Sequence, residues 1–187
     1  MAAANVLVIV GSLRKESFNR KMAKALIKLD AAPLNFEIAE IGNLPLYNQD
    51  LEGDHVPAEW SAFRTKVKAS DAVLFVTPEY NRSIPGVLKN AIDVASRPYG
   101  SNAFDGKPGA VISVSPGALG AFGANHHLRQ ALVFLNVPTM QQPEAYIGGA
   151  AAMFDGQGNL IKESTREFLK KFVEAFAKWI ETIRGKA

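Results

Sequence analysis

The feature that most constrains the fold is an apolar run near the N-terminus that ends in a polar, hydroxyl-rich loop. Residues Val6–Val10 are apolar and mostly β-branched, which is typical of a strand buried on both faces, as in a parallel sheet. Gly11 interrupts this run, and a polar loop over residues 12–19 leads into a helical pattern. A strand, a short loop and a helix in this order predict one unit of an α/β protein.

The loop has the chemistry of an anion site. Backbone N–H groups at a helix start lack partners within the helix, and the helix end carries roughly half a positive charge. Ser12 and Ser17 add hydroxyl donors, and Arg14 adds a permanent charge with a forked donor geometry. We expect a phosphate group as the ligand. The alternative is an ordinary turn in which Ser17 or Asn19 only caps the helix.

Strand and helix patterns then alternate five times along the chain. This alternation predicts one α/β domain over residues 1–187, with a five-stranded parallel sheet and helices on both faces. The expected strands after the first are 36–41, which alternates as a half-exposed edge strand, 72–77, 109–115 and 137–141, with irregular structure over 146–158. The expected helices are 19–29, 58–69, one opened by Pro85, 125–135 and 164–184.

Three polar or small-residue loops follow the first, third and fourth predicted strands. They span residues 11–19, 78–86 and 116–123. Ligands of doubly wound sheets bind outside the carboxyl ends of the strands, so we expect these loops to build one site. A long loop over residues 42–57 also carries Leu46 and Tyr47. These two side chains either cover a ligand, meet a partner chain or fold back onto the core.

Composition narrows the function classes. The net charge of +3 is spread without a dense basic run, so a nucleic-acid surface is not indicated. The chain has no cysteine, which removes disulfides and thiolate chemistry and fits a reducing compartment. No apolar run approaches the ~20 residues of a membrane span, and the N-terminus lacks a signal-peptide pattern. We therefore expect a cytoplasmic protein with no membrane or nucleic-acid partner.

Several motifs are missing from the sequence. It has no Gly-x-Gly-x-x-Gly after the first strand, no ATP or GTP phosphate loop and no Gly-x-Ser-x-Gly elbow. The histidines His55, His126 and His127 do not form a metal pattern, because the adjacent pair points apart on a helix. We expect no metal site.

The segments 11–19, Pro78-Glu-Tyr-Asn81 and 83–93 together resemble the NADPH-dependent FMN reductase family. Within it, the chain is most similar to bacterial soluble quinone reductases that also reduce chromate. The resemblance implies a flavodoxin-like fold with strand order 2-1-3-4-5, bound FMN, and hydride transfer from NAD(P)H to acceptors such as quinones. Because the chemistry then belongs to the flavin, it implies no obligatory catalytic acid or base.

The resemblance also assigns roles to individual residues. By this resemblance, the residues that bind the FMN phosphate and line its approach are Ser12, Arg14, Ser17, Phe18 and Asn19. The residues that line the flavin ring, largely through backbone groups, are Pro78, Glu79, Tyr80 and Asn81. Ser115 and Gly117 lie at the other edge of the ring.

Each ring residue has a structural alternative. Tyr80 is otherwise a core or interface residue, Glu79 a helix cap or interface ion pair, and Asn81 a turn residue. Arg82 departs from the family, which often has an aromatic residue there. It either draws anionic acceptors such as chromate, or is a surface or subunit-contact residue.

The resemblance further implies a homodimer or homotetramer, with His127, Arg129 and Glu144 as candidate polar contacts. Two other functions stay open. One is an electron-carrier flavodoxin, although such carriers tend to be acidic and this chain is basic. The other is a flavin-free regulatory protein on the same fold.

Overall fold

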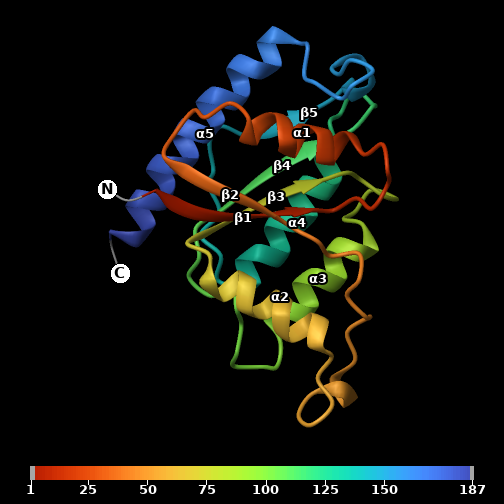
Figure 1. Ribbon diagram of the computed structural model, residues 1–187, viewed down its shortest axis with the longest axis vertical. Helices are drawn as coiled ribbons and strands as arrows, with labels where there is room; N and C mark the ends of the chain where they lie inside the picture. Colours follow the sequence, from red (N-terminus) through yellow and green to blue (C-terminus); the bar gives the residue numbers. More distant parts are fainter. Residues whose placement is uncertain (1–2, 186–187) are drawn as a thin grey trace.

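The structure, a computed structural model that describes residues 3–185, is a five-stranded parallel sheet between two layers of helices (Figure 1). The strand order is β2-β1-β3-β4-β5, and every neighbouring pair is parallel. The expected fold class and strand order are thus confirmed. The strands are β1 (Ala4–Val10), β2 (Leu34–Ala39), β3 (Ala72–Thr77), β4 (Gly109–Val114) and β5 (Ala145–Ile147).

Two helices cover one face of the sheet and three cover the other. Helices α1 and α5 share one hydrophobic cluster with the sheet, and α2, α3 and α4 share the second cluster. Within residues 3–185, no helix is both long and apolar enough to cross a membrane. The helices are α1 (Phe18–Ile27), α2 (Ala58–Ala69), α3 (Gly86–Ser96), α4 (Phe122–Phe134) and α5 (Glu163–Arg184), with short 3-10 turns η1 (Gln49–Leu51) and η2 (Ala150–Ala152).

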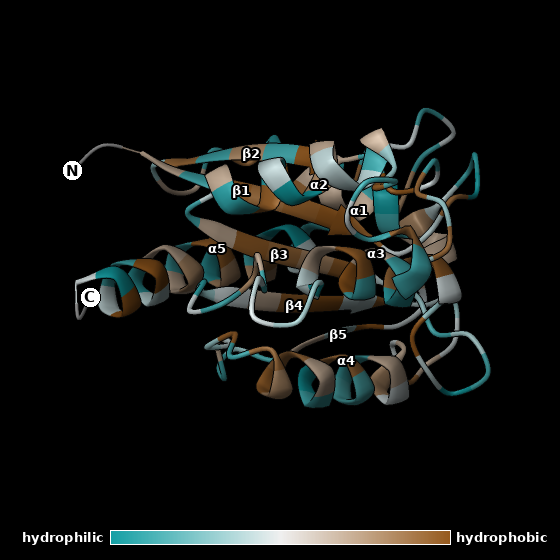
Figure 2. Cartoon of the chain, turned by 90° about the horizontal axis from the view of Figure 1, so that it is seen from below, coloured by the Kyte–Doolittle hydropathy of each residue, from teal (hydrophilic) through white to brown (hydrophobic). Residues whose placement is uncertain are grey.

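The central strands are buried on both faces, as the apolar runs predict. In β1, Val6, Val8 and Val10 face α1 and α5, whereas Leu7 and Ile9 face the other helices. Figure 2 shows the resulting hydrophobic strands inside a more polar shell of helices. Successive side chains of a strand point to opposite faces, so a run without polar residues fills both clusters at once.

The fifth strand was predicted in the wrong place. Residues 137–141 run beside the start of β4, but only Thr139 forms a bridge, with Gly109. The ladder forms later, where Ala145 and Ile147 pair with Ile112 and Val114. Proline residues explain the difference, because Pro138 and Pro143 have no N–H to donate to a ladder.

In the long loop after β2, Tyr47 folds back onto the core and its neighbour Leu46 does not. Tyr47 stacks on Trp60 with ring centroids 5.3 Å apart, and its N–H donates to Asn90 Oδ1 at 2.8 Å. Leu46 is 79% exposed. Of the two apolar residues singled out from the sequence, Tyr47 therefore belongs to the core, and only Leu46 faces solvent.

Candidate functional site

The three polar loops meet at the carboxyl edge of the sheet. Val10 at the end of β1 pairs with Val76 of β3, and Thr77 pairs with Ser113 of β4. The side chain of Asn19 crosses from α1 to this edge, where Nδ2 donates to the Val114 carbonyl at 3.3 Å. The loops that leave β1, β3 and β4 thus begin side by side, as the sequence predicts.

The first loop ends in a capped helix start. Ser17 is the N-cap of α1, and its Oγ accepts from the Arg20 N–H at 3.2 Å. The first turn of α1 contains no acidic residue that would complement the helix dipole. Within residues 3–185, the backbone N–H groups of 12–16 also have no hydrogen-bond acceptor. The cap expected from the alternative interpretation is present, and it leaves these donors available to an anion.

Buried polar groups lie behind this loop. Ser12, Ser17 and Asn19 are each at most 4% exposed. The Oδ1 atom of Asn19 is buried and has no hydrogen-bond partner among the described residues. An unsatisfied buried acceptor is uncommon in a folded protein. A ligand that brings a hydroxyl donor to this atom would satisfy it.

Two residues assigned to the phosphate region differ in their surroundings. Arg14 is exposed on the loop. Phe18 is half-buried and stacks on Phe154 at 6.3 Å between ring centroids. Phe18 thus anchors the start of α1 to the segment before α5, and Arg14 is a solvent-exposed cation of the loop.

The second loop is a tight hairpin after β3. Tyr80 and Ser83 exchange backbone hydrogen bonds of 3.0 and 2.9 Å. Asn81 and Arg82 between them have φ values of +50° and +64°. Two left-handed residues in a two-residue turn define a type I′ turn, which asparagine tolerates better than most residues do. The turn alternative therefore holds for Asn81, and the turn leaves Tyr80 49% exposed at the edge of the site.

The Glu79 carboxylate is held by the start of α4. Its Oε2 accepts from the Ala124 N–H at 3.1 Å, in the first turn of α4, and Oε1 lies 3.4 Å from Arg82 Nη1. The capping alternative thus describes its side chain, and the backbone of 78–81 is left to line the site. A Cβ atom on Gly123 would lie 2.8 Å from this carboxylate, so glycine permits the approach.

The third loop is closed by a serine and by the glycines after β5. Ser115 Oγ accepts from the Gly117 N–H at 3.0 Å, and the Gly117 carbonyl accepts from Gly149. A Cβ atom on Gly148 would lie 2.4 Å from the Ala118 carbonyl oxygen. Sequence reasoning missed Gly123 and Gly148. The small-residue composition of both segments is the signal that marks such close backbone contacts.

The adjacent histidines diverge, as the sequence predicts. His126 Nε2 lies 3.0 Å from the Tyr146 hydroxyl, and His127 Nδ1 lies 3.0 Å from Ser83 Oγ on the hairpin. The Tyr146 hydroxyl also donates to Glu144 at 2.8 Å. Burial and this carboxylate raise the pKa of Tyr146 to about 12. Sequence analysis included Ser83 in the family motif without assigning it a role, and it did not point to Tyr146, because both side chains act through partners distant in the chain.

A parallel sheet in the order 2-1-3-4-5, with ligand loops after β1, β3 and β4, defines a flavodoxin-like protein. The model of the NADPH-dependent FMN reductase family matches residues 4–152. The chain is 61% identical over 181 residues to a quinone reductase of Pseudomonas putida, with 97% of each chain covered. It is 45% identical to a 2-hydroxy-1,4-benzoquinone reductase of Burkholderia sp., with 97% of this chain and 99% of that protein covered.

Among solved structures, the flavoenzyme NAD(P)H:(acceptor) oxidoreductase of Paracoccus denitrificans superimposes with a TM-score of 0.90 at 47% identity. The alignment covers 96% of this chain and 98% of that one. The chain belongs to the NADPH-dependent FMN reductase family. This membership confirms FMN as the cofactor and NAD(P)H as the electron donor.

The site has groups that fit FMN. Phosphate requires fixed N–H donors and a cation, which residues 12–16 and Arg14 offer. The ribityl chain carries hydroxyl donors, which match the unsatisfied Asn19 Oδ1. A flat ring requires a compact loop beside it, and the tight turn at Asn81 and Arg82 is such a loop. The residues present are therefore compatible with the cofactor that the family uses.

Proposed function

We propose that this protein is an NAD(P)H-dependent, FMN-containing oxidoreductase that reduces quinones and also other acceptors such as chromate. Quinone as the acceptor class is supported by the names of the relatives. Chromate is supported by the placement of Arg82 at the outer end of the hairpin, where its side chain is 78% exposed. Bound FMN supplies a ring that takes a hydride from the nicotinamide and delivers electrons to the acceptor.

In this proposal the first loop holds the phosphate end of the cofactor. Backbone N–H groups of 12–16 and the hydroxyls of Ser12 and Ser17 donate to the phosphate, and Arg14 balances its charge. Phe18 supports this loop from behind through its contact with Phe154. Asn19 holds α1 against the end of β4 and accepts from the ribityl chain.

The second and third loops hold the ring. The backbone of Pro78, Glu79, Tyr80 and Asn81 lines one edge, and the N–H groups of Glu79 and Asn81 would stabilise negative charge on the ring. Ser115 and Gly117 border the other edge. Tyr80 is exposed enough to contact a nicotinamide or an acceptor beside the ring. No side chain is assigned as an obligatory acid or base.

One observation carries the proposal: unpaired amides at 12–16 and the unsatisfied Asn19 Oδ1 lie at the same sheet edge as the hairpin of 80–83. An electron carrier has the same fold, and turnover separates the two. The purified protein is saturated with FMN and mixed with NADPH or NADH and a panel of acceptors that includes benzoquinone and chromate. Catalytic loss of NAD(P)H with quinone supports the enzyme, whereas a stoichiometric reaction with every acceptor contradicts it.

We also propose that the chain forms a homodimer or homotetramer. Helix α4 exposes three apolar side chains, Phe122 at its first residue and Val133 and Phe134 at its end, which are 49%, 77% and 70% exposed. The polar residues expected at a contact have partners within the chain: His127 contacts Ser83, Arg129 donates to Asn125, and Glu144 accepts from Tyr146. Sedimentation velocity tests this proposal. The cytoplasmic location stays a prediction that a fractionation experiment tests.

A further inference from the structure

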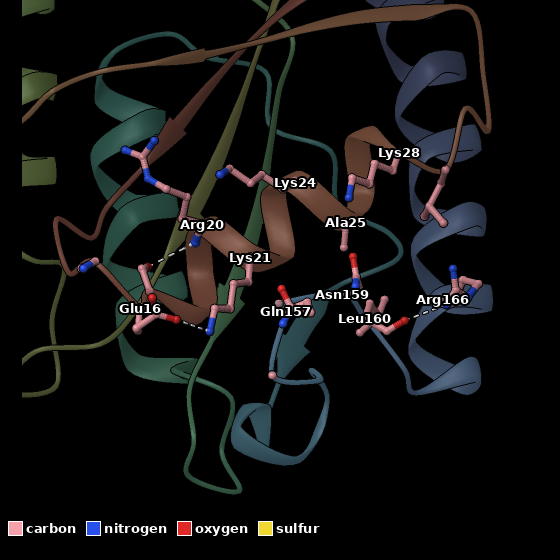
Figure 3. A pocket seen from close by; sticks show the side chains of 15 residues that line it. Glu16, Arg20, Lys21, Lys24, Ala25, Lys28, Gln157, Asn159, Leu160 and Arg166 are labelled. Carbon is pink, nitrogen blue, oxygen red and sulfur yellow. Dashed lines mark hydrogen bonds and ion pairs between the residues drawn. The ribbon is translucent and has the colours of Figure 1, made fainter.

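A second, strongly basic cavity adjoins the first loop and extends along α1. It has a volume of about 480 Å³ and lies between α1, the turn at 156–160 and the first turn of α5 (Figure 3). Figure 3 shows Lys24 and Lys28 along α1, with Lys24 directed toward Arg20, and Gln157 and Asn159 on the neighbouring turn. None of the residues assigned to the flavin ring lines the cavity, but Ser17 of the phosphate loop does. Its lining residues include six cations, Lys15, Arg20, Lys21, Lys24, Lys28 and Arg166, and one carboxylate, Glu16.

Half of these cations have a carboxylate partner and half do not. Arg20 pairs with Glu40 at 2.7 Å, Lys21 with Glu16 at 2.6 Å, and Arg166 with Glu163 at 3.1 Å. Lys15, Lys24 and Lys28 form no ion pair with any residue of 3–185. Three of the six cations that line the cavity therefore have no carboxylate within 4 Å among residues 3–185.

The wall opposite α1 is fixed by its own contacts. The carboxylate of Asp155 accepts from the Gln157 and Asn159 N–H groups at 2.9 and 2.8 Å, which closes the turn. The side chain of Lys21 packs on Gly158, whose added Cβ would lie 3.4 Å from Cε. Arg166 Nη2 donates to the Leu160 carbonyl at 2.6 Å and ties the turn to α5. The cavity is thus formed before any ligand binds.

The three lysines without an ion pair are spread over the length of α1 and its two ends. Lys24 and Lys28 are one helical turn apart, about 6 Å along the axis, and Lys15 lies beyond the N-terminus of α1. Like charges four residues apart disfavour a helix, and a bound anion removes this repulsion. A single phosphate cannot contact cations at both ends of such a row, whereas a chain of phosphates can.

We propose that this cavity, which shares Lys15, Glu16 and Ser17 with the first loop, is a second anion site beside the flavin phosphate loop and binds a small molecule carrying adjacent phosphate groups. Lys24 and Lys28 provide cations that form no ion pair within residues 3–185, and the side-chain amide of Gln157 provides a further donor. The site differs from the phosphate loop in its chemistry, because it binds through flexible ammonium groups and the loop binds through backbone N–H groups.

The test uses the FMN-saturated protein, so that the phosphate loop is filled. Inorganic tripolyphosphate is titrated by calorimetry at constant ionic strength, and orthophosphate is titrated in parallel. The Lys24→Gln/Lys28→Gln double variant is compared with a matched control, Lys170→Gln/Lys171→Gln, which removes two exposed lysines of α5 outside the cavity lining. Flavin absorbance of the protein fraction is recorded throughout.

We expect saturable binding of tripolyphosphate, at least tenfold tighter than that of orthophosphate. The Lys24→Gln/Lys28→Gln protein should bind at least tenfold more weakly, and the control variant should bind as the wild type does. Equal losses in both variants, no saturation, or release of FMN by tripolyphosphate would each overturn the proposal. Because quinone turnover is not a readout, the result is independent of the acceptor proposed above.

Discussion

The carboxylate of Glu79 accepts a hydrogen bond of 3.1 Å from the backbone N–H of Ala124. This bond joins the loop after β3 to the first turn of α4. The N-cap residue of α4, Ala121, has no side chain that can accept such a bond. Glu79 therefore caps a helix that begins far from it in sequence, and it fixes the backbone proposed to line the flavin ring.

Replacing Glu79 with alanine should destabilise the apoprotein by about 1 kcal/mol, because the Ala124 N–H loses its acceptor and the helix dipole its counter-charge. Glu79→Gln keeps an acceptor and should recover part of this loss. Urea unfolding measures both, with Glu174→Ala at an exposed position of α5 as the control. If the alanine and glutamine variants match the control, the bond to Ala124 has no energetic role.

Gly120→Ala should be among the most damaging substitutions near the site. Gly120 has a φ of +58°, and an added Cβ would lie 2.5 Å from the Tyr146 carbonyl carbon, a backbone atom that cannot rotate away. We expect a loss of about 3 kcal/mol or more, seen as insoluble protein or a greatly lowered urea midpoint. Gly86→Ala is the control, because nothing lies within 4 Å of its added Cβ. An equally stable Gly120→Ala protein would show that the loop is free to move.

The buried strands could be predicted because burial on both faces leaves a mark in the sequence itself. Residues 72–77 contain no charged side chain and form β3 with the expected bounds. Strand β5 could not be predicted in the same way, since its three residues are too few to form a periodic pattern. Its position depends on where β4 offers partners, which is a tertiary property.

In the candidate site, too, the features with a local sequence pattern could be predicted and those that depend on distant residues could not. Its three loops could be located because each directly follows a strand, and parallel strands end at a common edge. The cap from Glu79 to Ala124 spans 45 residues and leaves no local pattern. From the sequence alone, the lysines of α1 indicate only a solvated helix face. The turn at 156–160, which makes them one wall of a cavity, lies over a hundred residues later in the chain.

The Tyr146 hydroxyl should make stability fall at alkaline pH. Burial and the bond to Glu144 raise its pKa to about 12 in the folded state, above the ordinary value of 10.0. Its stabilising contribution is therefore complete below about pH 10 and is lost as the pH rises toward 12, since the unfolded chain ionises first. The free energy of unfolding should decrease more steeply over this range in the wild type than in Tyr146→Phe. Parallel curves for the two proteins would exclude this group as the cause.

Ser17→Ala distinguishes a capping residue from a ligand. Loss of the bond to the Arg20 N–H should destabilise the apoprotein by about 1 kcal/mol. If the hydroxyl also donates to the FMN phosphate, FMN affinity should fall about tenfold, as for the loss of one charge-assisted hydrogen bond. Flavin fluorescence titration measures the affinity, and Ser61→Ala on the exposed face of α2 is the control. An unchanged FMN affinity would reduce Ser17 to the cap alone.

Arg82→Tyr tests whether the charge at the hairpin selects acceptors. The Arg82 side chain is 78% exposed and only 3.4 Å from Glu79 Oε1, so most of its charge faces solvent beside the proposed ring site. An exposed cation raises the local concentration of anions and affects neutral molecules little. We expect kcat/KM for chromate to fall several-fold more than kcat/KM for benzoquinone, and the difference to shrink at high salt. Equal losses for both acceptors would assign Arg82 to the turn or to a subunit contact instead.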